Sequence, residues 1–143
     1  MDYLPLFHKL DKQNCLLVGG GSVATRKARL LLEARANVTV IAPTLSDELS
    51  QLATDQQIHH INRAFKPTDT LDFHLVICAV NDEQTNAQVS SEAWANNIPV
   101  NVVDQPLLCS FIFPAIVDRS PMTIAISSGG VASVLSRLMR AKL

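Results

Sequence analysis

The sequence predicts an α/β fold, in which a doubly wound parallel sheet is followed by a β-hairpin and a C-terminal helix. Short apolar runs alternate with helix-like segments over the first 104 residues, which is the pattern of βαβ units in a parallel sheet. A glycine-rich loop directly follows the first apolar run. Beyond residue 104, two β-like runs follow one another with few residues between them, which indicates a hairpin.

Composition excludes several classes of protein. The chain has 143 residues, which suits one domain at about 100–200 residues per domain. Hydrophobic residues make up 48% and charged residues 17%, so the chain can bury a core and is neither disordered nor fibrous. The net charge of -1 argues against a nucleic-acid partner. No apolar run approaches the roughly 20 residues of a membrane span, so we expect no membrane partner.

Five apolar runs predict the strands of the sheet. They are residues 14–18, 37–42, 58–62, 75–80 and 99–103. Runs this apolar suit strands that are covered on both faces, as in a parallel sheet.

Three helix-like segments, residues 23–34, 46–54 and 82–96, connect these strands. Ser46 is a candidate N-cap of the second helix, because its hydroxyl can accept a hydrogen bond from the first turn. Asp82 begins the third helix, where the helix dipole favours negative charge. Right-handed crossovers of this kind give one open sheet.

The pattern changes after residue 104. Residues 110–118 and 122–127 are predicted as two strands of a hairpin, joined by three residues. Pro114 within the first run suggests an edge position or a bulge, because proline cannot donate a ladder hydrogen bond. A final helix is expected from residue 131 to the end.

Cysteine and histidine usage predicts a reduced compartment and no resident metal. Cys15, Cys78 and Cys109 are odd in number and form no C-x-x-C pair. Cys15 and Cys78 lie in apolar runs, which is typical of buried thiols. We therefore expect a cytoplasmic protein. The four histidines lack the spacing with Cys or Glu that a zinc site needs.

Residues 19–24 read Gly-Gly-Gly-Ser-Val-Ala and fit the dinucleotide fingerprint G-x-G-x-x-A. Gly19 permits the tight turn, Gly21 lets a pyrophosphate approach the backbone, and Ala24 lets helix and strand pack closely. The helix start supplies N–H groups and a dipole for the phosphate charge. Because the motif follows a strand and opens a helix, it predicts dinucleotide binding by a Rossmann-like domain. A purely structural glycine turn is the alternative.

The second strand ends without the acid that usually binds the ribose hydroxyls. Its end reads Ile41-Ala42-Pro43-Thr44, so backbone groups or Thr44 must hold the ribose. The motif alone leaves the choice between NAD and NADP open.

Asp104 meets the rule that ligands bind beyond the carboxyl ends of the strands in an open sheet. An acid there would lie near a nicotinamide bound across the crevice and could transfer a proton. A loop-capping role for Asp104 is the alternative. Ser127 and Ser128 precede two glycines and a helix. They are candidate N-caps, and the helix start could alternatively offer N–H groups to a carboxylate.

Charge is unevenly distributed along the chain. Residues 67–118 contain no Lys or Arg, whereas every charged residue after them is basic. These basic residues are Arg119, Arg137, Arg140 and Lys142. Solvated helix faces would explain them, and an anionic ligand or partner at this end is the alternative.

Five stretches of the chain resemble the N-terminal module of the siroheme synthase family. They are residues 1–7 (MDYLPLF), 18–32 (VGGGSVATRKARLLL), 38–43 (VTVIAP), 101–106 (NVVDQP) and 110–138 (SFIFPAIVDRSPMTIAISSGGVASVLSRL). The resemblance runs nearly end to end, and the combination of motifs is very specific.

This resemblance implies a function in siroheme biosynthesis. The family oxidises precorrin-2 to sirohydrochlorin with NAD as the hydride acceptor, and the same cleft inserts Fe²⁺ to give siroheme. Ser22 and Val23 match positions beside the NAD pyrophosphate, and Pro43 and Thr44 match positions beside the ribose. Asp104 matches the acid that accepts a proton in the dehydrogenation and assists metal insertion.

The resemblance also implies a substrate site and a dimer. Ser128 matches the serine beside the tetrapyrrole, whose many carboxylates make Arg119 and Arg137 candidate partners. Iron is a substrate here, and the macrocycle nitrogens become its ligands. The family forms homodimers, and the hairpin is the expected contact. We therefore expect residues 1–104 to form the NAD-binding domain and residues 105–143 to form a dimerisation segment that begins a further helical region.

Two positions depart from the family pattern. Arg35 replaces a glycine that ends the first helix, and an arginine with left-handed backbone costs on the order of 1 kcal/mol. Ala132 and Ser133 replace a Ser-Pro pair just after the two glycines. Two other functions remain alternatives: a Rossmann module that senses a nucleotide, and a shortened domain that binds NAD without turnover.

Overall fold

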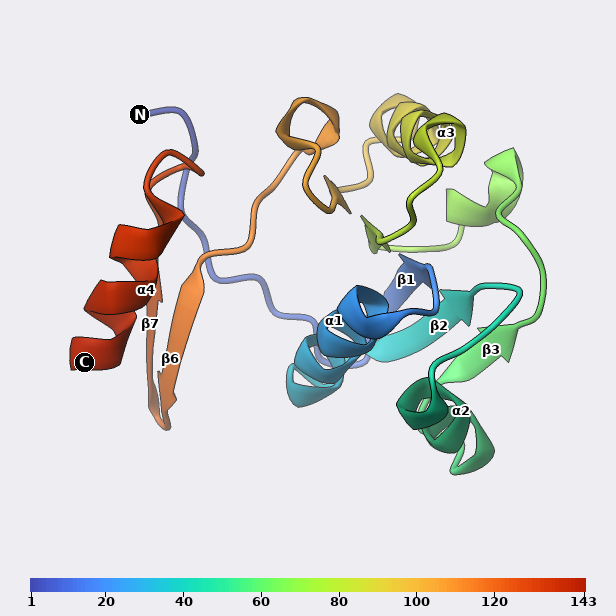
Figure 1. Cartoon of the computed structure of the whole chain (residues 1–143), viewed down its shortest axis with the longest axis horizontal. Helices are drawn as coiled ribbons and strands as arrows, with labels where there is room; N and C mark the ends of the chain where they lie inside the picture. Colours follow the sequence, from blue (N-terminus) through green and yellow to red (C-terminus); the bar gives the residue numbers. More distant parts are fainter. The chain divides into compact units, whose positions relative to one another are not determined.

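Five parallel strands form the centre of the first of two units, Phe7–Ser110, which we call the sheet unit (Figure 1). The computed structural model describes residues 1–143. The strands lie in the order β3-β2-β1-β4-β5. They are β1 (Asn14–Val18), β2 (Asn37–Ile41), β3 (His59–Ile61), β4 (Leu75–Cys78) and β5 (Val100–Val102). All of β4, and all of β1 beyond its first residue, is buried. The predicted α/β fold with a parallel sheet is confirmed.

Three helices connect these strands. They are α1 (Ser22–Glu33), α2 (Asp47–Thr54) and α3 (Glu83–Ala95). α1 packs against β1 and β2, whereas α3 packs against β4 and β5. Figure 1 shows α1 and α2 on one side of the strands and α3 on the other. The strand order reverses between β1 and β4, which is the point where open α/β sheets bind their ligands.

The helix ends follow the local signals of the sequence. The Ser46 hydroxyl accepts a hydrogen bond from the Leu49 N–H at 3.2 Å, and the Asp82 carboxylate accepts one from the Thr85 N–H at 3.2 Å. Arg35, just beyond α1, has a φ of 61°. Arg35 therefore has the left-handed backbone conformation that was expected at this position.

The sequence pattern does not reveal two short 3₁₀ helices, η1 (Pro67–Thr70) and η2 (Pro106–Leu108). Each is too short for a periodic pattern. Each begins at a proline, whose fixed φ suits the first helical position. Among the helices of the structure, none is long and apolar enough to cross a membrane.

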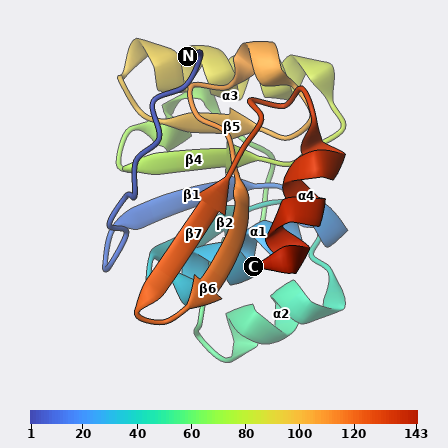
Figure 2. The ribbon, with the colours of Figure 1, turned by 90° about the vertical axis from the view of Figure 1, so that its left-hand side faces the viewer.

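The second unit, which we call the hairpin unit, combines Met1–Leu6 with Phe111–Leu143. Its elements are β6 (Ala115–Arg119), β7 (Met122–Ile126) and α4 (Ser133–Lys142). β6 and β7 pair antiparallel, and α4 packs against both (Figure 2). The predicted hairpin and C-terminal helix are confirmed.

Three of the predicted boundaries in the hairpin unit are wrong. The first strand does not span 110–118 but begins after Pro114, because proline lacks the N–H that a ladder needs. That strand runs on through Arg119, so only two residues form the turn. The helix begins at Ser133 rather than 131, and no side chain caps its first turn.

Candidate functional site

Gly19 lies at the switch point of the sheet, between the ends of β2 and β4. Its N–H donates to the Ile41 carbonyl at 3.0 Å, and its φ is 126°. A Cβ at this position would lie 2.3 Å from the Ala79 carbonyl oxygen. Only glycine fits here, which is the tight-turn role of the first fingerprint glycine.

Gly20 is not a fingerprint position, yet it is equally constrained. A Cβ there would lie 2.0 Å from the Thr44 carbonyl oxygen and 3.1 Å from the Ala42 Cβ. The loop after β2 therefore passes directly over Gly20. No local sequence signal shows this close approach, because its cause lies more than 20 residues away.

Gly21 faces open space, since a Cβ there would meet nothing within 4 Å. It is the N-cap of α1, and no side chain caps this helix. The first-turn N–H groups beside exposed Ser22 and half-buried Val23 thus meet no competing side chain. Ala24 is fully buried against the sheet. This loop has the geometry of an anion-binding helix start with room for a ligand.

The segment after β2 carries Pro43 and Thr44, the residues expected beside the ribose, and both are exposed. The strand ends at Ile41, in register with Val18 of β1, so this segment borders the glycine loop. No carboxylate follows Ile41 directly, and Glu48 in the next helix is paired with Arg29. A ribose placed here would meet backbone groups and the Thr44 hydroxyl.

On the other side of the glycine loop, Asp104 lies two residues beyond the end of β5 and is exposed. Its φ is 62°, a left-handed conformation that asparagine and aspartate tolerate better than most residues. The Val103 N–H donates to the Cys78 carbonyl at 3.0 Å, and the Gln105 N–H donates to the Val102 carbonyl at 3.1 Å. Asp104 therefore forms the tip of a tight loop at the ligand-binding edge of the sheet.

Asp82, the other acid at this edge, serves as a helix cap. Its carboxylate accepts hydrogen bonds from the Thr85 hydroxyl at 2.5 Å and the Thr85 N–H at 3.2 Å. These bonds, the side-chain bond above all, lower the pKa of Asp82. It is therefore committed to the start of α3.

The half-buried Cys109 thiol closes the loop that carries Asp104. Its Sγ lies 3.2 Å from both the N–H and the carbonyl of Val102, and 3.3 Å from the Gln105 carbonyl. Burial raises the pKa of Cys109, and the Val102 contact opposes that rise. The Ser90 hydroxyl donates to the Leu108 carbonyl at 2.7 Å and anchors the same loop. Cys109 therefore has a structural role in this loop.

Lys27 is a charged group near Asp104 that belongs to no sequence motif. Its side chain is half-buried on α1, three residues after Ala24. Burial lowers the pKa of Lys27, the charge of Arg26 lowers it further, and the charge of Asp104 opposes both. The three-residue spacing from a buried alanine is the signal that could have placed Lys27 toward the sheet.

In the hairpin unit, both candidate serines bond to their own loop. The Ser128 hydroxyl accepts from the Ala132 N–H at 2.7 Å, and the Ser127 hydroxyl accepts from the Gly129 N–H at 3.0 Å. Because Ala132 is itself the N-cap residue, Ser128 orders the loop before α4 rather than the helix start.

The candidate arginines lie along the hairpin unit rather than together at Ser128. Arg119 is at the turn of the hairpin, beside a hollow of about 230 Å³ that Arg140 and Asp118 also line. Arg137 is exposed in the middle of α4. Ser128 follows the opposite end of β7, and five strand residues separate the two ends by about 17 Å. Arg119 and Ser128 therefore cannot hold the same carboxylate.

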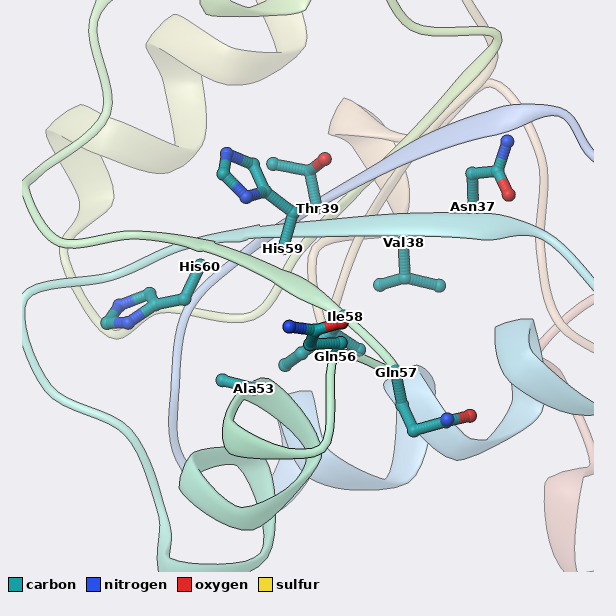
Figure 3. Close-up of a pocket in the computed structure, with 9 residues that line it drawn as sticks. All are labelled: Asn37, Val38, Thr39, Ala53, Gln56, Gln57, Ile58, His59 and His60. Atoms are coloured by element: carbon teal, nitrogen blue, oxygen red, sulfur yellow. The ribbon is translucent and has the colours of Figure 1, made fainter.

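A larger hollow of about 540 Å³ lies between α2 and the strands β2 and β3 (Figure 3). Figure 3 shows His59 and His60 pointing apart at its edge, and the His60 Nε2 lies 2.8 Å from the Ala42 carbonyl oxygen. Its lining from β2 comes from the first half of that strand, away from the glycine loop. None of the candidate site residues lines it, and no group of three metal-binding side chains lies in the described residues 1–143.

Comparisons with known proteins agree with this geometry. Residues 6–115 match the model of a family described as "Putative NAD(P)-binding". The chain is 54% identical over 143 residues to siroheme synthase of Pseudomonas entomophila and 49% identical over 144 residues to that of Nitrosomonas europaea, with 100% of this chain covered in both. The structure matches SirC, precorrin-2 dehydrogenase, with a TM-score of 0.83 and 26% identity, over 98% of this chain and 69% of that chain.

The chain spans 31% of the length of the Pseudomonas relative and 30% of the length of the Nitrosomonas relative. It corresponds to the N-terminal region of those proteins.

Proposed function

Because the chain belongs to this NAD(P)-binding family, we propose that it oxidises precorrin-2 to sirohydrochlorin in siroheme biosynthesis, with NAD as the cofactor. One observation carries the proposal: the glycine loop, open at Gly21, and the exposed acid Asp104 lie at the same edge of one sheet, on either side of its switch point. The similarity of the whole of this chain to part of the siroheme synthases and the match to a precorrin-2 dehydrogenase support the choice of substrate.

The residues at this edge fit a dinucleotide. The N–H groups at the start of α1, beside Ser22 and Val23, would hold the pyrophosphate, with Gly21 leaving it room. Pro43 and Thr44 would hold the adenosine ribose through backbone groups and the Thr44 hydroxyl. The end of β2 lacks the acidic side chain that usually binds the ribose hydroxyls. We therefore propose that the preference for NAD over NADP comes from how closely the backbone of residues 43–44 fits the ribose.

The oxidation removes two hydrogens from the substrate, one as a hydride and one as a proton. NAD, when bound, supplies the hydride acceptor. Asp104 would accept the proton on a carboxylate oxygen, from which water can remove it because the side chain is exposed. The charge of Asp104 opposes the lowering of the Lys27 pKa, so the two side chains lie close enough to interact electrostatically.

Fe²⁺ insertion is the second proposed activity, with iron as a substrate. Two pyrrole N–H protons must leave as the metal enters the macrocycle. Asp104 would accept these protons in turn, so one carboxylate would serve both reactions. The chain itself would need no permanent metal ligands for this chemistry.

The hairpin unit is proposed to contribute Ser128, Arg119 and Arg137 to the carboxylates around the tetrapyrrole. Arg119 and Ser128 lie at opposite ends of the hairpin, so these two would bind different carboxylates. Ser128 would act through the loop that its hydroxyl orders.

The hairpin unit is also proposed as the contact of a homodimer. In the single chain, Val117 and Ser136 are its only buried residues. Val134, Leu135 and Leu138 form an apolar stripe on α4 at helical spacing, each more than half exposed. A second copy of the chain would cover this stripe. Sedimentation velocity should show a dimer that Leu135→Lys converts to monomer, and a monomeric unaltered chain at tens of micromolar would refute the dimer.

We propose a cytoplasmic location, since Cys15, Cys78 and Cys109 are all free thiols.

Incubation with precorrin-2 and NAD, followed at the NADH absorbance, tests the activity. The unaltered chain should form NADH, and Asp104→Asn should reduce the rate by about two to four orders of magnitude while NAD still binds. Equal rates from both proteins would remove Asp104 from the mechanism. NAD binding without NADH from either protein would indicate a nucleotide-binding module instead.

A further inference from the structure

The segment that follows β2 touches the glycine loop through its backbone. The Thr44 carbonyl oxygen lies 2.0 Å from where a Gly20 Cβ would be, and the Ser46 N–H donates to the Gly20 carbonyl at 2.7 Å. The segment of residues 43–45 is therefore held at both ends, by β2 before it and by Ser46 after it. Under the proposed function, this segment binds the ribose.

A chain of hydroxyl hydrogen bonds continues this contact into α1. The buried Thr25 hydroxyl bonds to the Gly21 carbonyl at 2.7 Å and to the Ser46 hydroxyl at 2.7 Å. The Ser46 hydroxyl also accepts from the Leu49 N–H at 3.2 Å. A carbonyl oxygen can only accept a hydrogen bond, so the Thr25 hydroxyl donates its one proton to Gly21 and accepts a hydrogen bond from the Ser46 hydroxyl. The hydrogen bonds thus all run in one direction, with Leu49 donating to Ser46, Ser46 to Thr25, and Thr25 to Gly21.

An ion pair extends the same connection one helical turn further. Arg29 on α1 binds Glu48 on α2 through two parallel hydrogen bonds, one of them 2.5 Å between Nη2 and Oε1. Both side chains are exposed, so solvent weakens this pair. The buried Thr25 hydroxyl and the half-buried Ser46 hydroxyl are less exposed to solvent, so they are the stronger part of the connection.

We propose that Thr25 and Ser46 are positioning residues for the adenosine half of the dinucleotide. They hold residues 43–45 at a fixed place relative to the pyrophosphate loop, so that backbone groups can bind the ribose without a carboxylate. Ordering that segment before the ligand arrives lowers the entropy cost of binding. The inference rests on the proposed NAD binding and extends it to two residues that do not themselves contact the cofactor.

Isothermal titration with ADP, nicotinamide mononucleotide and NAD tests this role in the full chain. Thr25→Val removes the hydroxyl and keeps the side-chain shape. We expect it to weaken ADP and NAD binding about three- to tenfold, the effect of one lost hydrogen bond, and to leave nicotinamide mononucleotide binding within about twofold. Thr25→Ser, which restores the hydroxyl, should restore the affinity. Faster amide exchange at Ser46 in Thr25→Val would show the loosened segment directly.

Two control variants separate positioning from stability. Thr54→Val removes a hydroxyl that donates to the Ser50 carbonyl at 3.0 Å, four residues earlier in α2. This bond has the same spacing as that of Thr25 to Gly21, but it lies at an exposed helix end. Ser90→Ala removes a buried hydroxyl bond of similar length in α3 and should lower the melting temperature like Thr25→Val. Neither control should change ADP affinity.

Two results would overturn the inference in different ways. If the unaltered chain binds NAD and Thr25→Val binds ADP equally well, Thr25 is structural only and the proposed function stands. If the unaltered chain binds neither ADP nor NAD, the proposed function fails and the positioning role fails with it.

Discussion

Substituting alanine at two adjacent glycines should have opposite effects on stability. At Gly20, the new methyl group would lie 2.0 Å from the Thr44 carbonyl oxygen, so the loop must move by about 1.4 Å to reach the 3.4 Å of ordinary contact. Overpacking of this kind costs about 1–3 kcal/mol. At Gly21, nothing lies within 4 Å and the φ of -88° suits alanine. Alanine there makes the unfolded chain less flexible than glycine does, which should raise the free energy of unfolding by about 0.4–1 kcal/mol.

The two variants should also differ in how they lose the ligand. Gly21→Ala places a methyl group where the pyrophosphate would approach, so NAD affinity should fall in a protein that is as stable as the original or more so. Gly20→Ala should lose affinity together with stability, because the displaced loop carries Pro43 and Thr44. Thermal unfolding, followed by the fluorescence of the single Trp94, and calorimetric titration with NAD measure both quantities. A Gly21→Ala variant that binds NAD normally, or that melts as early as Gly20→Ala, would refute the reasoning.

Three further predictions concern ionisable groups and backbone strain. Burial raises the pKa of Cys15 to about 11 and that of Cys78 to about 12, so iodoacetamide at pH 8 should modify Cys109 first; mass spectrometry of the peptides would detect another order. Burial lowers the pKa of Lys27 in the folded chain below the 10.5 of an unperturbed lysine. The unfolded chain therefore holds the Lys27 proton more tightly, and the free energy of unfolding should rise with pH between the pKa of Lys27 in the folded chain and 10.5. Lys27→Met should therefore be more stable than the original at pH 7, with the gain shrinking toward pH 10 in urea titrations. Arg35→Gly should add about 1 kcal/mol, because glycine adopts the φ of 61° without strain, and an unchanged urea midpoint would contradict this.

The architecture could be predicted because its signals are local. Every strand of the sheet except β3 lies in an apolar run, and the caps at Ser46 and Asp82 act within their own first turn. The left-handed position of Arg35 could be expected from the resemblance described above, which implies a glycine there. The start of the hairpin could not be predicted, because the apolar pattern continues through Pro114 while the hydrogen bonding does not.

The parts of the site that escaped prediction depend on contacts between distant segments. Gly20 must be glycine because of Thr44, and the Thr25 hydroxyl is fixed by Ser46, 21 residues away. Neither pair has a spacing that a periodic pattern could report. Lys27 could be placed on α1 from the sequence, but its electrostatic interaction with Asp104 follows only from the order of the strands.

The same principle accounts for the position of Asp104. Its own neighbours leave it exposed, with a backbone conformation that most residues avoid. That conformation persists because the loop is held from outside, by the Cys78 carbonyl on β4 and by the Cys109 thiol, which bonds to Val102. The carboxylate can therefore stay in contact with water while its location is set by the buried pairing of β4 and β5. Both properties suit the proton-acceptor role proposed for Asp104, because a fixed carboxylate can meet a substrate and an exposed one can release the proton to solvent.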